Sequence, residues 1–170
     1  MFHGSVKSAW VYSLVCCGFV LGLSGCSQSR KGGGSSTMVI GQQAHTAVYG
    51  TGAQGKLEFV IVTDLPSDGT KVSMSISSFP LSVFSGWKGS IRTPSGKTIQ
   101  FKANNNHLEI DGARYPFNKG RLFLLSGNSG KISVEQLNVP IGNSPREVEL
   151  EQVAKRDEVQ RFFGGDGGTR

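Results

Sequence analysis

Three side chains able to do catalytic or metal-binding chemistry stand at alternate positions in one short stretch, as His107, Glu109 and Asp111. A strand places alternate residues on one face at steps of about 6.5 to 7 Å. Imidazole and carboxylates together suit a hard or borderline metal ion, so one hypothesis is a metal-assisted hydrolase. The competing interpretation is a solvated strand face opposite the apolar Leu108 and Ile110. We favour it, and predict no catalytic residue and no metal ligand.

Two other stretches resemble catalytic or nucleotide-binding motifs but fail on spacing. Gly96-Lys97-Thr98 has the ending of a phosphate loop, yet the earlier glycine that the loop requires would fall at Ile91. Gly127-Asn128-Ser129-Gly130 is one residue short of a nucleophile elbow. Of the remaining histidines, His45 falls in a segment predicted to be a tether. A Ser-His-Asp arrangement stays open, but the sequence singles out no serine for it.

A basic and aromatic region lies between Gly86 and Lys131, where only Glu109 and Asp111 are acidic. Its cations are Lys88, Arg92, Lys97, Lys102, Arg114, Lys119, Arg121 and Lys131, and its interleaved aromatic residues are Trp87, Phe101, Tyr115, Phe117 and Phe123. Cations alternating with aromatic rings can bind oligonucleotides or glycans on a small barrel. The alternative is a solvated sheet face whose lysines protect edge strands from aggregation.

The amino-terminal segment has the layout of an export signal. Lys7 precedes an apolar run over residues 9–23. As a helix this run would span about 22 Å, which is less than the roughly 30 Å of a membrane's hydrocarbon core. The three cysteines, Cys16, Cys17 and Cys26, all lie in or beside this segment. The rest of the chain therefore has no thiol for an intramolecular disulfide or a thiolate metal site.

The four residues Leu23-Ser24-Gly25-Cys26 resemble the lipobox of bacterial lipoproteins. The resemblance implies cleavage after residue 25, a diacylglycerol on the sulfur of Cys26, and an acylated new amino terminus. Ser27, in place of an aspartate, resembles the pattern that permits transfer to the outer membrane in many Gram-negative bacteria. The alternatives are an ordinary signal peptide or an uncleaved anchor, with Cys26 as an incidental thiol. Two or three acyl chains would make the attachment effectively permanent.

The chain after this cysteine divides into a tether and a β-domain. Residues 26–55 are rich in glycine and serine, which predicts a flexible tether; Met38-Val39-Ile40 in it could add an edge strand. Residues 56–140 alternate polar with apolar positions and carry frequent turn formers, such as Asp111-Gly112. We predict an antiparallel domain of six to eight strands, as a small sandwich or partly open barrel with one wet face.

Residues 141–163 form the predicted C-terminal helical segment. Ser144 followed by Pro145 and, three residues after the serine, Glu147 has the form of a capped helix start. Val148 and Leu150 instead alternate with glutamates as in a strand. We predict a helix that ends at residue 164, and a disordered tail over residues 164–170.

Composition limits the chain to one modest domain. Its 170 residues are 37% hydrophobic and 18% charged, with a net charge of +6. Excess positive charge suits anionic surroundings. We expect a lipid-anchored protein of the bacterial cell envelope, with a non-enzymatic binding or structural β-domain that uses a basic face and no cofactor. Its partners would be another envelope protein, a cell-wall polymer or an anionic surface, but not nucleic acid. The alternative is an extracytoplasmic hydrolase with a metal at His107, Glu109 and Asp111.

Overall fold

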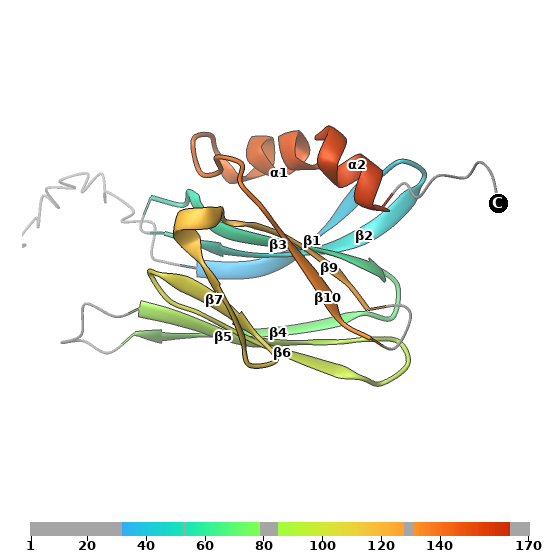
Figure 1. Cartoon of the computed structure of the whole chain (residues 1–170), viewed down its shortest axis with the longest axis horizontal. Helices are drawn as coiled ribbons and strands as arrows, with labels where there is room; N and C mark the ends of the chain where they lie inside the picture. The colour runs from blue at the N-terminus through green and yellow to red at the C-terminus, as the bar shows by residue number, and fades with distance from the viewer. Residues whose placement is uncertain (1–31, 53, 79–84, 128–130, 164–170) are drawn as a thin grey trace, which may run out of the picture.

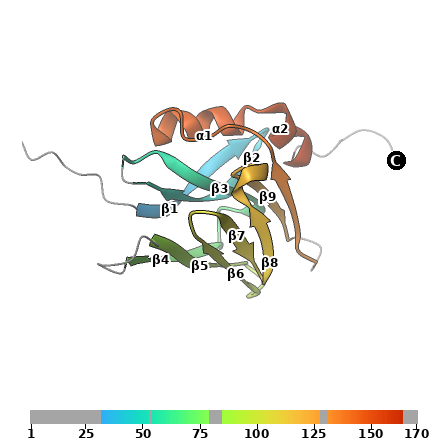
Figure 2. The ribbon, with the colours of Figure 1, turned by 60° about the vertical axis from the view of Figure 1, so that its left-hand side comes forward.

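The computed structural model describes residues 32–52, 54–78, 85–127 and 131–163. They form three layers, with two helices on one side, a central sheet in the middle and an outer sheet on the other side (Figures 1 and 2). The predicted signal peptide, Cys26 and the predicted tail over residues 164–170 lie outside the described residues.

The central sheet has five strands in the order β1-β2-β3-β9-β10. They are β1 (Gly32–Ile40), β2 (Gln43–Thr51), β3 (Leu57–Pro66), β9 (Leu122–Ser126) and β10 (Ser133–Leu137). The outer sheet is an antiparallel meander of β4 (Lys71–Ser78), β5 (Ser85–Arg92), β6 (Thr98–Ala103), β7 (His107–Ile110) and β8 (Ala113–Pro116). The two open sheets confirm the mainly β prediction, as a sandwich and not as a barrel.

Tight turns join the strands of the outer sheet where the sequence predicts them. Asp111 and Gly112 connect β7 to β8 with φ values of 45° and 86°. Positive φ at both positions gives the backbone twist that a two-residue hairpin needs. Pro94-Ser95-Gly96 similarly turns β5 into β6, and the Thr93 N–H donates to the Lys97 carbonyl at 2.8 Å.

The main core lies between the two sheets. Along the outer sheet, inward residues alternate with polar outward ones, as in β6, where Ile99, Phe101 and Ala103 are buried and the residues between them are exposed. The fully or nearly fully buried large side chains of this core include Phe59, Ile61, Trp87, Ile91, Ile99, Phe101, Leu108, Phe123 and Leu125. Phe59 meets Trp87 edge to face, with ring centroids 5.5 Å apart, which is a favourable aromatic geometry.

A second core lies between the central sheet and the helices. It contains Met38, Ile40, Tyr49, Val60, Val62, Leu122, Leu124, Val153 and Val159. β3 therefore contributes to both cores, and five consecutive residues of it, 59–63, are buried. The prediction that β3 has one wet face is wrong, because the strand runs through the middle layer and the helices cover its second side.

The predicted flexible tether over residues 26–55 is wrong for residues 32–51. β1 and β2 occupy most of this segment and pair antiparallel over nine residue pairs, from Gly32 with Thr51 to Ile40 with Gln43. The suggested edge strand at residues 38–40 is confirmed as the end of β1, which lies at an edge of the central sheet. Glycine in β1 serves close packing: a Cβ on Gly33 would collide with the Met74 sulfur and crowd the Trp87 ring.

The purely antiparallel prediction needs two corrections. β9 pairs with β3 in parallel, with Val60 opposite Leu122. The chain also leaves the central sheet after β3, builds the whole outer sheet and then returns. Turn residues after β3 therefore lead to the other sheet and not into a hairpin. The described strands number ten rather than six to eight, chiefly because of β1 and β2.

The C-terminal segment is helical, as predicted, but it is broken into α1 (Arg146–Ala154) and α2 (Asp157–Phe163). The break explains why the apolar residues of this segment do not fall on one side of a single continuous helix. α1 buries Val153 and half-buries Leu150, whereas α2 buries Val159. The start of α1 also differs from the predicted capping box, since the Ser144 N–H donates to the buried Glu149 carboxylate at 3.1 Å instead of to Glu147.

None of the helices in the described ranges is long and apolar enough to cross a membrane.

Candidate functional site

Alternation along the outer sheet turns a group of cations to the side facing away from the core. We call the exposed residues Lys71, Lys88, Arg92, Lys102 and Arg114 the basic face. Lys88, Lys102, Glu109 and Arg114 are opposite one another on β5, β6, β7 and β8. Neighbouring strands lie about 4.8 Å apart, so this row crosses about 14 Å of the sheet.

Only one carboxylate lies within the row of cations. Glu109 Oε1 is 3.4 Å from Lys102 Nζ, and Glu109 Oε2 is 3.7 Å from Arg114 Nε. Both cations are well exposed, so these ion pairs contribute little to stability. One carboxylate shared between two cations leaves the row with an excess of positive charge, because Lys88 adds a third cation.

A hollow of about 320 Å³ opens at one end of the basic face. Its polar lining consists of Lys88, Lys102, Asn104, His107, Glu109 and Arg114. Trp87 also borders it, and its Nε1–H donates to the Gly32 carbonyl at 3.0 Å. The hollow thus lies at the end of the sandwich where β1 begins, which is the end nearest in sequence to Cys26.

The structure contradicts the hypothesis that cations and aromatic rings share one face, and agrees with the alternative of a solvated sheet face. All five aromatic residues of that region pack in the core between the sheets or against it: Trp87, Phe101, Tyr115, Phe117 and Phe123. The same alternation that exposes the lysines turns the rings inward. Lys119 and Arg121 also lie off the basic face, in and after the short 3-10 helix η1 (Phe117–Lys119), and the Arg121 guanidinium stacks 5.0 Å from the Phe117 ring centroid.

The three candidate metal ligands do not form a common site. His107 and Glu109 both line the hollow, but Asp111 belongs to the turn after β7, where its Oδ1 accepts the Gln100 N–H at 2.8 Å. Among the described residues no group of three His, Cys, Asp or Glu side chains could hold a metal ion. The geometry therefore offers no observation that favours a metal-assisted hydrolase.

A polar cleft around His45 is a feature that the sequence pattern did not predict. This residue is 3% exposed on β2, and its Nδ1 lies 3.1 Å from the Thr63 carbonyl oxygen. Its ring packs 4.9 Å from that of Phe163 on α2. Within the described chain its Nε2 has no hydrogen-bond partner. The missed signal was the apolar run Ala47-Val48-Tyr49 in β2, which the glycine-rich composition around it obscured.

The cleft beside His45 measures about 420 Å³ and also contains Asp64 and Ser126. The Ser126 hydroxyl donates to Asp64 Oδ2 at 2.5 Å, and the Gly127 N–H donates to Asp64 Oδ1 at 2.9 Å. The imidazole of His45 does not accept the serine proton, because one ring nitrogen faces Thr63 and the other has no partner. The three residue types of a hydrolytic triad are thus near one another without the linkage that catalysis requires.

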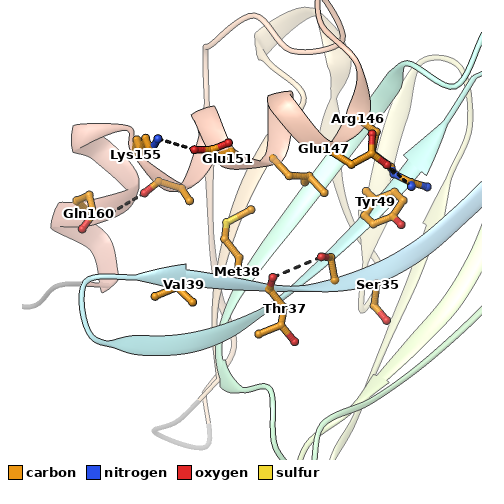
Figure 3. A pocket seen from close by; sticks show the side chains of 13 residues that line it. Ser35, Thr37, Met38, Val39, Tyr49, Arg146, Glu147, Glu151, Lys155 and Gln160 are labelled. Atoms are coloured by element: carbon orange, nitrogen blue, oxygen red, sulfur yellow. Dashed lines mark hydrogen bonds and ion pairs between the residues drawn. The ribbon is translucent and has the colours of Figure 1, made fainter.

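A third concavity, a groove of about 450 Å³, runs between β1 and α1 (Figure 3). The Arg146 guanidinium lies 5.4 Å from the Tyr49 ring centroid. Lys155 Nζ donates to Glu151 at 2.6 Å, and this hydrogen bond lowers the pKa of Glu151. The pKa of Glu147 is lowered by a hydrogen bond from its own backbone and by Arg146. The charges along the groove are therefore paired within α1 and with the residue that follows it.

In comparisons with family models, curated proteins and solved structures, nothing matches this chain. Its function must be inferred from its own residues.

Proposed function

We propose that this protein is an exported, lipid-anchored protein of the bacterial envelope, and that its sandwich is a non-enzymatic binding domain. Cys26 is the attachment point, in a sequence that resembles a lipobox. The outer membrane is its location if the host is Gram-negative. The basic face of the outer sheet is the binding surface, and its partner is an anionic surface such as phospholipid headgroups, with an acidic cell-wall polymer or envelope protein as the other candidates.

The observation that carries this proposal is that the basic hollow lies at the end of the sandwich where β1 begins, close in sequence to Cys26. Only five residues separate Cys26 from Gly32, where β1 begins. Even a fully extended chain of this length reaches only about 20 Å. The hydrogen bond from Trp87 to Gly32 fixes the hollow at this same end of the sandwich. A domain connected to a lipidated Cys26 by so short a linker would stay close to the membrane surface.

The charge distribution supports the same partner. Each Lys or Arg near an anionic membrane surface contributes about 1 kcal/mol to binding, and this attraction falls off within a Debye length. Three such cations lie in the row formed by Lys88, Lys102 and Arg114, partly offset by Glu109. Aromatic residues that would stack on sugars or bases are turned inward, so an electrostatic surface suits this face better than a stacked ligand.

The binding surface can be tested by vesicle sedimentation with the chain from Ser27 onward, which lacks the anchor. We expect it to bind vesicles that contain anionic lipid, and to be released by high salt. Lys88→Gln with Lys102→Gln should weaken binding about 30-fold, the equivalent of about 2 kcal/mol. The matched control is Lys155→Gln with Arg161→Gln, which removes the same charge from the helical layer.

Two results would reject this surface. One is equal binding to neutral and anionic vesicles. The other is an equal loss of binding in the basic-face and control variants. The anchor is tested separately with full-length Cys26→Ser, which should abolish lipid labelling and release the protein from membranes. Lipid labelling that persists in this variant would refute attachment at Cys26 while leaving the binding surface untouched.

A further inference from the structure

The four edges of the two sheets differ sharply in how they are protected against pairing with another chain. β8 has four residues, including Arg114 and Pro116, and β10 has five. Short strands, proline and charge all discourage further pairing at a sheet edge. Gln136 of β10 also reaches the Pro116 carbonyl at 2.7 Å, which links these two edges to each other.

The opposite side of the sandwich has two long edges without such protection. β1 has nine residues, none of them charged and none of them proline. β4 has eight residues, and its only charge is Lys71 at the start. The two strands lie one above the other (Figures 1 and 2). Each has a hydrogen-bonded neighbour on only one side among the described strands. An edge of this kind is a template for β-augmentation.

The sequence of β1 fits a second copy of itself. It reads GGGSSTMVI, with three glycines at the start and three large apolar residues at the end. Antiparallel pairing about Ser36 would place Gly34 opposite Met38 of the second copy, and Gly33 opposite Val39. Every large side chain then faces a glycine, so the joined strands do not crowd each other.

Val39, one of the three large apolar residues of β1, is exposed in the single copy. Val39 is 64% exposed, the largest value among the exposed large apolar residues of the described chain. It lies at the end of the groove between β1 and α1, as Figure 3 shows. Pairing would cover it and would close the open side of this groove.

The extent of the two edges meets the requirement of a stable dimer. Nine residues of strand are about 30 Å long, and two stacked sheets about 10 Å apart present a strip about 20 Å wide. The strip would bury about 600 Å² on each copy, or about 1,200 Å² in total, which is the lower limit for specific protein interfaces. We propose that this protein forms a twofold-symmetric dimer in which β1 pairs antiparallel with β1 of a second copy about Ser36.

The symmetry has a consequence for the basic face. A twofold axis that relates antiparallel neighbours in a sheet is perpendicular to the sheet, so both copies turn their helices to one side and their outer sheets to the other. The dimer would present two basic faces to the same surface. This consequence, unlike the pairing itself, rests on the proposed function.

Cysteine crosslinking in membranes that contain the full-length protein tests the pairing and its register. Ser36→Cys places its thiol opposite its own copy, where paired strands bring Cα atoms to about 4.5 to 5.5 Å, within the range of a disulfide. We expect a disulfide-linked dimer under mild oxidation. The matched control, Val39→Cys, is also at an exposed position but would lie about 20 Å from its own copy in this register, so it should not be crosslinked.

Sedimentation of the chain from Cys26 onward in detergent gives a second readout. We expect a dimer mass, and a monomer mass for Val39→Lys, because the ammonium would be buried against Gly33 of the second copy. Val148→Lys, which changes another exposed valine on α1, should remain dimeric. A monomer mass for the unchanged chain, or equal crosslinking of both cysteine variants, would overturn the proposal. Neither measurement depends on lipid binding by the basic face.

Discussion

Replacement of a single isoleucine in β1 tests whether residues 32–40 form a packed strand or a flexible tether. Ile40 is 2% exposed and packs under the helices. Full burial of such a side chain contributes about 1.5 to 3 kcal/mol, of which threonine keeps only part. A buried hydroxyl without a partner costs a further 1 to 3 kcal/mol or so. We expect Ile40→Thr to lower the free energy of unfolding by about 2 to 4 kcal/mol.

The control for this substitution is the neighbouring residue. Val39 is 64% exposed in the single copy, so Val39→Thr, which also keeps a β-branched side chain, should change the free energy of unfolding by less than about 0.5 kcal/mol at protein concentrations low enough to keep the chain monomeric. The position next along the strand thus undergoes the same chemical change without burial. Any difference between the two variants measures packing and not strand propensity.

Urea unfolding of the chain from Ser27 onward provides the measurement. Trp87 is its one tryptophan, because Trp10 lies before this start. Trp87 is 1% exposed and bonded to the first residue of β1, so its fluorescence should report the transition. With a slope of about 2 kcal/mol per molar urea, Ile40→Thr should lower the midpoint by about 1 to 2 M. Equal midpoints for both variants would show that residues 32–40 are not part of the domain.

Two further predictions concern a strained glycine and an ion pair. Gly120 has a φ of 125°, and a Cβ there would collide with the Leu137 carbonyl. Gly120→Ala should therefore lower the free energy of unfolding by at least about 3 kcal/mol, measured by thermal unfolding. Gly96→Ala should lower it by only about 1 kcal/mol, because a Cβ at Gly96 meets no other atom. Lys155→Gln should raise the pKa of Glu151 toward its ordinary value, which a carboxyl NMR titration would detect. Because the pKa of Glu151 is lowered in the folded state, this group stabilises the fold at pH values above the ordinary carboxylate pKa. This contribution is lost as the pH falls through the pKa of Glu151 in the folded protein. An unchanged pKa of Glu151 in Lys155→Gln would refute the contact.

The outer sheet was predictable because each of its strands follows a local rule. Its strands alternate, its described turns carry glycine, proline or asparagine, and each strand pairs with the next along the chain. β1 and β2 were missed because glycine and serine are also the residues of linkers. Their glycines instead allow side chains to cross the strand closely, as at Gly50, where a Cβ would collide with the Phe59 ring. Composition alone does not distinguish these two uses of glycine.

The candidate site was only partly readable from the sequence, for a related reason. Four of the eight cations of the region, Lys88, Arg92, Lys102 and Arg114, lie on the basic face. Whether an aromatic neighbour shares that face depends on whether it lies an odd or an even number of positions away along the strand. Trp87 and Lys88 are adjacent and therefore point to opposite sides. The environment of His45 depends on Phe163, which lies 118 positions later in the sequence and contacts its ring. No local pattern predicts a contact of that range.

The parallel pairing of β3 with β9 has a consequence for the order in which the protein folds. About 55 residues, the whole outer sheet among them, separate the two strands. Closing a loop of that length costs about 3.5 kcal/mol of chain entropy. The outer sheet is contiguous and built from neighbouring hairpins, so we expect it to form early and bring the ends of β3 and β9 together. The centre of the molecule would then be completed late, with the outer meander as the template for its assembly.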